Sequence, residues 1–226
     1  MRQSLFSKYL STPRYTRYLS STGNNKKKAE KLYNGNIRLS QAFHPILSQF
    51  EIVLRNSIND VLVSHFADPD WIINQKRGFM SHASLRRGHY RMRATVQNAE
   101  NKLAQVRTPV TSGMVISDMT FGFWTAIFLS HHYSLVAGRP IQAFAYKPAV
   151  EDRASIHSKL EKIRSFRNRI NHCEPICFNG NNIDCSYAED VRDTIFDLIN
   201  WIEPDLVPFF KKIDNIQSKI NNIMSI

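Results

Sequence analysis

Apolar residues recur every three or four positions along three long stretches of the chain, a pattern typical of amphipathic helices. These stretches are residues 37–66, 151–172 and 187–202. In the second, the apolar stripe consists of Ile156, Leu160, Ile163, Phe166 and Ile170. No strand-like alternation and no internal repeat stands out. The pattern predicts an all-α fold.

Proline, glycine and polar turn residues indicate where these helices end or change direction. Pro45 is expected to kink or divide the first helix, and Asp68 to Trp71 form a turn after it. The apolar run at residues 114–129 predicts one core helix, in which Gly122 would allow close packing. Its aromatic side chains are more typical of a core than of a base-stacking surface.

The two ends of the chain are expected to be accessory to this bundle. A single domain is predicted over residues 1–226, because the chain has 226 residues. Residues 1–25 are interpreted as an N-terminal appendage with a short helix and a polar turn. Residues 211–226 are interpreted as a C-terminal tail, either a last helix or a frayed end. A further turn is expected at residues 178–182.

Composition indicates a cytoplasmic protein without a metal or cofactor. No apolar run approaches the roughly 18 residues of a membrane span, so no membrane association is expected. Cys173, Cys177 and Cys185 form an odd set in a chain long enough to fold without disulfides, so reduced thiols are expected. Their spacing lacks the paired C-x2-C motifs of common zinc sites. We therefore expect no metal ion.

The charge favours a polyanionic partner, because 30 Lys and Arg residues against 19 Asp and Glu give a net charge of +11. Residues 76–107 carry eight basic residues against one acidic residue, Glu100. Within them, basic side chains alternate with an aromatic ring, which suits contacts to the backbone and bases of single-stranded RNA. The candidate RNA-binding residues are Arg86, Arg87, Tyr90, Arg91 and Arg93. A basic helix face that contacts only solvent would show the same pattern of residues.

The end of the helix predicted at 151–172 carries the best candidate chemistry. At about 100° per residue, Asn168 and His172 share a face nearly opposite the apolar stripe, whereas Arg167 falls within the stripe's arc. An imidazole can exchange protons near neutral pH, and a guanidinium can hold phosphate oxygens. This pair would suit metal-free cleavage of RNA. The alternative is a histidine that favours the negative end of the helix dipole, beside a solvated arginine.

The wider sequence around this pair, Arg167 to Ile176, resembles the signature of the abortive-infection (Abi) proteins, a branch of the HEPN superfamily of all-helical ribonucleases. The resemblance is closest to the AbiF-type members. Asn171 and Cys173 stand where that signature has Ala and His. Further similar blocks are Tyr18-Leu19, Leu32 to Asn36, Leu39 to Phe43, Glu51 to Asn56, Phe121 to Trp124 and Trp201 to Pro204.

The resemblance implies a HEPN-type helical bundle with additional helices and a metal-independent endoribonuclease toxin of an abortive-infection or toxin–antitoxin system. His172 would be the acid/base, Arg167 the phosphate holder and Asn168 the orienting group. Supporting residues would be Glu51, Arg55, Asn56 and Glu174. Glu51 and Arg55 could equally form an ion pair that only orients two helices.

The implied partners are an RNA substrate, a small non-coding RNA antitoxin and a second copy of the chain. A homodimer would supply the second proton carrier that in-line cleavage needs. Glu174 stands where related toxins carry a tyrosine that a nucleotidyltransferase modifies, so that route of silencing is not expected. The main alternative is a non-catalytic RNA-binding or regulatory protein with the HEPN fold. A third possibility is a helical module that binds peptides or membranes. It would account for the net charge but not for the signature.

Overall fold

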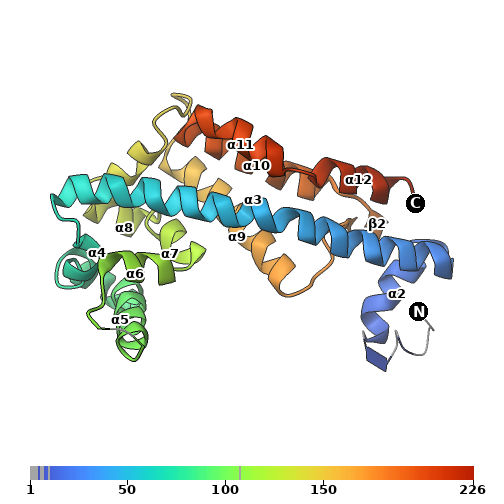
Figure 1. Ribbon diagram of the computed structural model, residues 1–226, viewed down its shortest axis with the longest axis horizontal. Helices are drawn as coiled ribbons and strands as arrows, with labels where there is room; N and C mark the ends of the chain where they lie inside the picture. Colours follow the sequence, from blue (N-terminus) through green and yellow to red (C-terminus); the bar gives the residue numbers. More distant parts are fainter. Residues whose placement is uncertain (1–4, 6–7, 10, 107) are drawn as a thin grey trace. The chain divides into compact units, whose positions relative to one another are not determined.

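The structure is a computed structural model that describes residues 5, 8–9, 11–106 and 108–226. Within these residues the chain is almost entirely helical, with one short β-hairpin (Figure 1). The hairpin pairs β1 (Phe178–Asn179) with β2 (Asn182–Ile183), and its turn lies where the turn at 178–182 was predicted. The predicted all-α class is confirmed.

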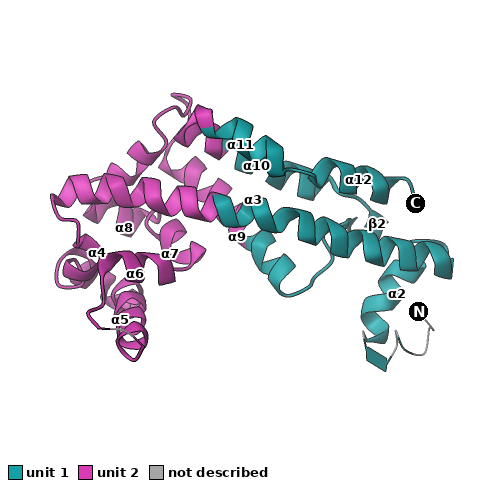
Figure 2. Ribbon diagram, in the orientation of Figure 1, with its two compact units in different colours: residues 1–49, 165–197, 206–226 teal, residues 50–164, 198–205 magenta. Residues whose placement is uncertain are grey.

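The chain forms two compact units (Figure 2). Unit 1 consists of residues 1–49, 165–197 and 206–226, and unit 2 of residues 50–164 and 198–205. Three continuous helices contribute to both units: α3 (Lys26–Phe66), α9 (Arg153–Asn171) and α10 (Ser186–Ile202). Because these helices run through both units, the single domain over 1–226 stays a prediction.

The core of unit 1 includes side chains from α2 (Thr12–Ser20), near the N-terminus, and from the C-terminal helix α12 (Ile216–Met224). The helix α2 buries Tyr15 and Tyr18, and the Tyr18 ring lies 5.1 Å from the ring of Phe178. After α11 (Val207–Ile213), the helix α12 buries one face. The last-helix interpretation of the tail is therefore confirmed and the frayed end is wrong, since three apolar side chains of α12 are in the core: Ile216, Ile220 and Ile223.

The helix α3 extends the helix predicted at 37–66 toward the N-terminus, to the basic residues Lys26, Lys27 and Lys28, which the sequence indicated as a helix start. It begins at Lys26, where the Asn25 side-chain oxygen accepts hydrogen bonds from the backbone N–H groups of Lys27 and Lys28, both at 3.1 Å. Pro45 lies inside α3 and does not divide it. Its ring is exposed, and burial of neighbours such as Phe43 and Ile46 offsets the hydrogen bond that proline cannot make.

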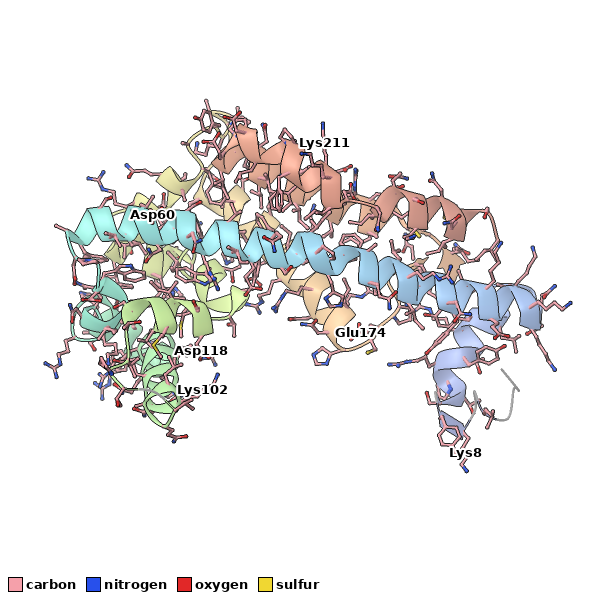
Figure 3. All side chains as sticks on the ribbon, viewed as in Figure 1. Lys8, Asp60, Lys102, Asp118, Glu174 and Lys211 are labelled. Carbon is pink, nitrogen blue, oxygen red and sulfur yellow. The ribbon has the colours of Figure 1, made fainter. Side chains whose placement is uncertain are left out.

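Unit 2 holds a second core, built around large aromatic side chains that include Trp71, Trp124 and Phe128. Several short helices surround it, and an ion pair between Lys102 of α5 and Asp118 of α6 joins two of them (Figure 3). The elements are α4 (Trp71–Asn74), η1 (Phe79–Ser81), η2 (Ala83–Gly88), α5 (Arg91–Ala104), α6 (Ser112–Asp118), α7 (Phe121–Ala126), α8 (Ser130–Leu135), η3 (Arg139–Ala143) and η4 (Pro204–Leu206), the last of which continues into unit 1.

The single core helix predicted at 114–129 is wrong. The chain instead forms α6 and α7, because Met119 and Thr120 between them have extended backbones, with ψ of 134° and 162°. This break lets Met119, Phe121 and Trp124 all reach the core, which confirms the core interpretation of the aromatic block. Gly122 is not a close-packing position, since an added Cβ would meet its nearest neighbour at 3.7 Å, an ordinary contact.

Candidate functional site

The C-terminal end of α9 presents two of the predicted trio, Asn168 and His172, on its outer side. All five residues of the apolar stripe are buried, with Ile163 and Phe166 fully inaccessible. Asn168 and His172 are exposed, and Arg167 is half-buried. The two exposed side chains are one turn apart, so α9 offers a hydrogen-bonding amide and an imidazole to a ligand from solvent.

Main-chain hydrogen bonds fix the position of His172 at the end of α9. The His172 N–H donates to Asn168 O at 2.9 Å, and the next two N–H groups fold back, Cys173 to Ile170 O at 2.9 Å and Glu174 to Arg169 O at 2.8 Å. Together these form a Schellman motif, with Cys173 in the left-handed conformation at φ 55°. The imidazole therefore stands on a defined helix end rather than on a loose loop.

The loop after His172 is held by two residues that the sequence interpretation did not assign. Arg169 donates from Nη2 to Pro175 O at 2.6 Å, and its Nε lies 3.5 Å from Glu174 Oε2. The Ile176 N–H donates to the buried Asn36 Oδ1 at 2.8 Å, which ties the loop to α3 within unit 1. Arg169 and Asn36 both lie in sequence blocks that resemble the Abi family. That resemblance was the signal that could have identified them. Figure 3 shows Glu174 at this loop, and its observed partner is Arg169.

The three cysteines are free thiols in different surroundings. Cys173 is exposed beside His172, whereas Cys177 and Cys185 are buried in unit 1. Burial raises the pKa of Cys177 to about 12 and that of Cys185 to about 12. Both buried thiols therefore stay protonated near neutral pH, a form that neither attacks nor binds a metal. Within the described part of the chain, no three side chains of the metal-ligating types cluster.

The predicted supporting residues Glu51, Arg55 and Asn56 lie on α3 in unit 2, whereas the signature residues belong to unit 1. Glu51 and Arg55 are half-buried and Asn56 is exposed. Arg55 Nε is buried, without a hydrogen-bond partner in the part of the chain that the structure describes. The choice between a helix-orienting ion pair and a role at the site stays open.

The structure divides the basic segment into two groups. Arg86, Arg87, Arg91 and Arg93 are all exposed, and Tyr90 is half-buried. Arg91 and Arg93 are two residues apart on α5, so they lie about 200° apart around the helix. Arg87 and Arg91 line one pocket of unit 2, whereas Tyr90 and Arg93 line another hollow. The five candidates therefore do not form one continuous strip.

Comparison with known proteins identifies no relative: no family model, curated protein or solved structure matches the chain. Across the described residues, no helix is long and apolar enough to cross a membrane.

Proposed function

We propose that this protein is a metal-independent endoribonuclease toxin of an abortive-infection or toxin–antitoxin system, of the AbiF-type HEPN class. The observation that carries the proposal is the exposed Asn168–His172 face at the capped end of α9, beside half-buried Arg167. A proton-transferring group, a phosphate-binding cation and an orienting amide thus come from six consecutive residues, Arg167 to His172.

The proposed reaction is attack of a ribose 2′-hydroxyl oxygen on the adjacent phosphorus, with cleavage of the bond to the 5′ oxygen. His172 takes the hydroxyl proton, and Arg167 stabilises the charge that develops on the phosphate oxygens. Asn168 orients the reacting group. The leaving 5′ oxygen needs a proton from a second carrier, and the products are a cyclic phosphate and a 5′-hydroxyl.

The proposed assembly is a cytoplasmic homodimer whose two-fold symmetry brings two copies of the motif together, so that the second His172 supplies the leaving-group proton. The exposed arginines of η2 and α5 contact the RNA backbone. A small non-coding RNA is the proposed antitoxin, as the resemblance to AbiF-type proteins implies, and the net charge of +11 is compatible with a polyanionic partner.

The test is RNA cleavage by the purified full chain and by single variants. His172→Ala is expected to lower the cleavage rate by about 10²–10⁴-fold, the usual contribution of acid–base catalysis. Arg167→Lys keeps the charge but loses the two-pronged guanidinium, and is expected to slow cleavage as well. Toxicity in cells should fall in parallel, and a chelator should leave the rate unchanged.

The matched control is His44→Ala, which removes another exposed histidine of unit 1. It should cleave RNA at the wild-type rate. Thermal unfolding measurements on each variant would check that it is still folded. A folded His172→Ala protein that cleaves as fast as the wild type would refute the catalytic proposal and leave an RNA-binding or regulatory protein in its place.

A further inference from the structure

Unit 2 contains a pocket of about 640 Å³ whose lining includes none of the proposed catalytic trio but two of the arginines proposed to contact RNA, Arg87 and Arg91. Its size lies within the range of small-molecule sites, which are typically about 300–1,000 Å³. Residues of η2, α5, α7 and α9 line it, together with the two histidines at the start of α8. These segments are far apart in sequence, so the pocket is a product of the tertiary fold.

The charged groups of the lining all have one sign. Arg87, Arg91 and Arg164 contribute three guanidinium groups, and the described lining includes no carboxylate side chain. Arg164 is held in place by an ion pair between its Nη1 and Glu161 Oε1 at 3.1 Å, one turn earlier on α9. A guanidinium group binds phosphate oxygens through two parallel hydrogen bonds. The pocket therefore suits a phosphorylated ligand.

The rest of the lining is largely apolar and includes the buried side chains of Leu85, Met92 and Phe123. Methionine sulfur and aromatic rings are favourable neighbours for the flat face of a nucleobase. An inorganic phosphate ion would leave this apolar surface uncovered. The combination favours a ligand with both a phosphate and a planar ring.

His132 adds a hydrogen-bonding group whose protonation the structure defines. Its ring is buried, and Nδ1 lies 2.8 Å from Ala126 O, so Nδ1 donates to that carbonyl. Burial lowers the pKa of His132, with a further contribution from neighbouring His131. Near neutral pH the ring is therefore neutral, and Nε2 is a hydrogen-bond acceptor, as the amino groups of nucleobases require.

We propose that this pocket binds a nucleotide unit, with its phosphate on Arg87, Arg91 and Arg164 and its base against Met92 and Phe123. The nucleotide is either part of an RNA chain or a free mononucleotide, which share this chemistry. The site does not depend on catalysis at His172. It lies in unit 2, whereas the proposed catalytic trio lies in unit 1.

The experiment is calorimetric titration of the full chain with AMP, adenosine, inorganic phosphate and a short oligoadenylate. The variant is Arg87→Ala/Arg91→Ala, which removes two exposed side chains and should leave folding intact. It is expected to weaken nucleotide binding by at least about tenfold, since each lost charge-assisted hydrogen bond costs that order. Adenosine and phosphate should each bind more weakly than AMP.

The matched control is Arg77→Ala/Arg139→Ala, which removes two other exposed arginines of unit 2 that do not line the pocket. It loses the same charge and should bind as the wild type. A second variant, Gly122→Leu, places a side chain in the lining and should block the ligand. Thermal unfolding of all variants verifies the fold.

Saturable AMP binding that only the pocket variants weaken supports the site and identifies free nucleotide as a ligand. Binding of the oligonucleotide alone, with the same sensitivity, supports the site and identifies the RNA chain as the source. Equal losses in the Arg87/Arg91 and Arg77/Arg139 variants would overturn the proposal, as would the absence of binding to every probe. The His172→Ala variant, titrated with AMP and assayed for RNA cleavage in parallel, separates this site from the proposed catalytic site, because it should bind AMP as the wild type does.

Discussion

Cys173 is one of the non-glycine residues with a left-handed backbone conformation. It follows His172 and has φ of 55°, in the C′ position of a Schellman motif where glycine is the usual residue. A side chain with a Cβ in this conformation costs roughly 1–2 kcal/mol relative to the right-handed region. The end of α9 therefore holds His172 in place at some cost in stability.

The first prediction is that Cys173→Gly raises the free energy of unfolding by about 1 kcal/mol, because glycine relieves this strain. Cys173→Ala is the matched control, since it removes the thiol but keeps the Cβ, and it should leave stability nearly unchanged. Urea unfolding followed by circular dichroism measures both. A glycine variant no more stable than the alanine variant would show that the conformation carries little strain.

The buried thiols give a pH-dependent prediction. Burial raises the pKa of Cys177 and of Cys185 to about 12 each, against an ordinary value of 9.0. Between these values the unfolded chain loses the two protons and the folded chain keeps them, so stability falls as pH rises from about 9 to 12. Replacing both with alanine should make the stability curve shallower in this window, even if absolute stability drops.

Thiol labelling measures the same difference directly. At neutral pH a thiol reagent should modify exposed Cys173 quickly and the two buried cysteines only after denaturant is added. Mass spectrometry of the labelled peptides distinguishes the three positions. Rapid labelling of Cys177 or Cys185 in the native protein would contradict their buried position.

At the scale of elements, α5 separates residues that the sequence groups together. Arg91 and Arg93 lie on different sides of this helix, and only Arg91 shares a pocket with Arg87. An RNA strand that follows the pocket would contact Arg87 and Arg91 more closely than Arg86 and Arg93. The composition of the segment alone does not distinguish these groups. It records how many basic residues are present but not on which side of the helix each one lies.

The next prediction concerns the salt dependence of RNA binding. Each phosphate contact to a single strand contributes about 0.7 to the slope of log affinity against log salt concentration. Arg87→Ala/Arg91→Ala should flatten this slope by about 1.4, and Arg86→Ala/Arg93→Ala should flatten it less. Filter binding at a series of salt concentrations gives both slopes. A slope unaltered in both double variants would show that the segment is a basic helix face that contacts only solvent.

At the scale of the whole molecule, the proposed reaction makes assembly part of catalysis. The trio on α9 supplies one acid/base group, and in-line cleavage needs a second on the far side of the phosphate. One other Arg-x4-His pair occurs in the sequence, Arg77 and His82, but it belongs to unit 2 and lies outside the motif at the end of α9. A symmetric pair of chains is the simplest source of the second group.

The last prediction tests this by mixing wild-type and His172→Ala chains under conditions where subunits exchange. If a site needs both histidines, activity should fall as the square of the wild-type fraction, because only wild-type pairs cleave. Light scattering with and without RNA measures the mass of the assembly. A linear fall in activity, or full activity from a monomer, would exclude the composite site.

The sequence by itself determined two of the long helices and the outward face of the candidate site. The predicted helices at 151–172 and 187–202 differ from α9 and α10 by only one or two residues at their ends. Burial of Ile163 and Phe166 with exposure of Asn168 and His172 follows from spacing along one helix. These features are local, since a helix fixes the angle between residues three or four positions apart.

Only the tertiary structure decided which distant residues meet. It joined Asn36 to Ile176 across 140 positions, and it placed Arg164 and His132 in the pocket that Arg87 and Arg91 line. It also kept α3 continuous through Pro45 and broke the apolar run at Met119 and Thr120. In each case the packing of a whole unit outweighed a local preference of about 3 kcal/mol or less. Such outcomes depend on side chains that are close in space but not in sequence, and periodicity along the chain carries no information about those pairs.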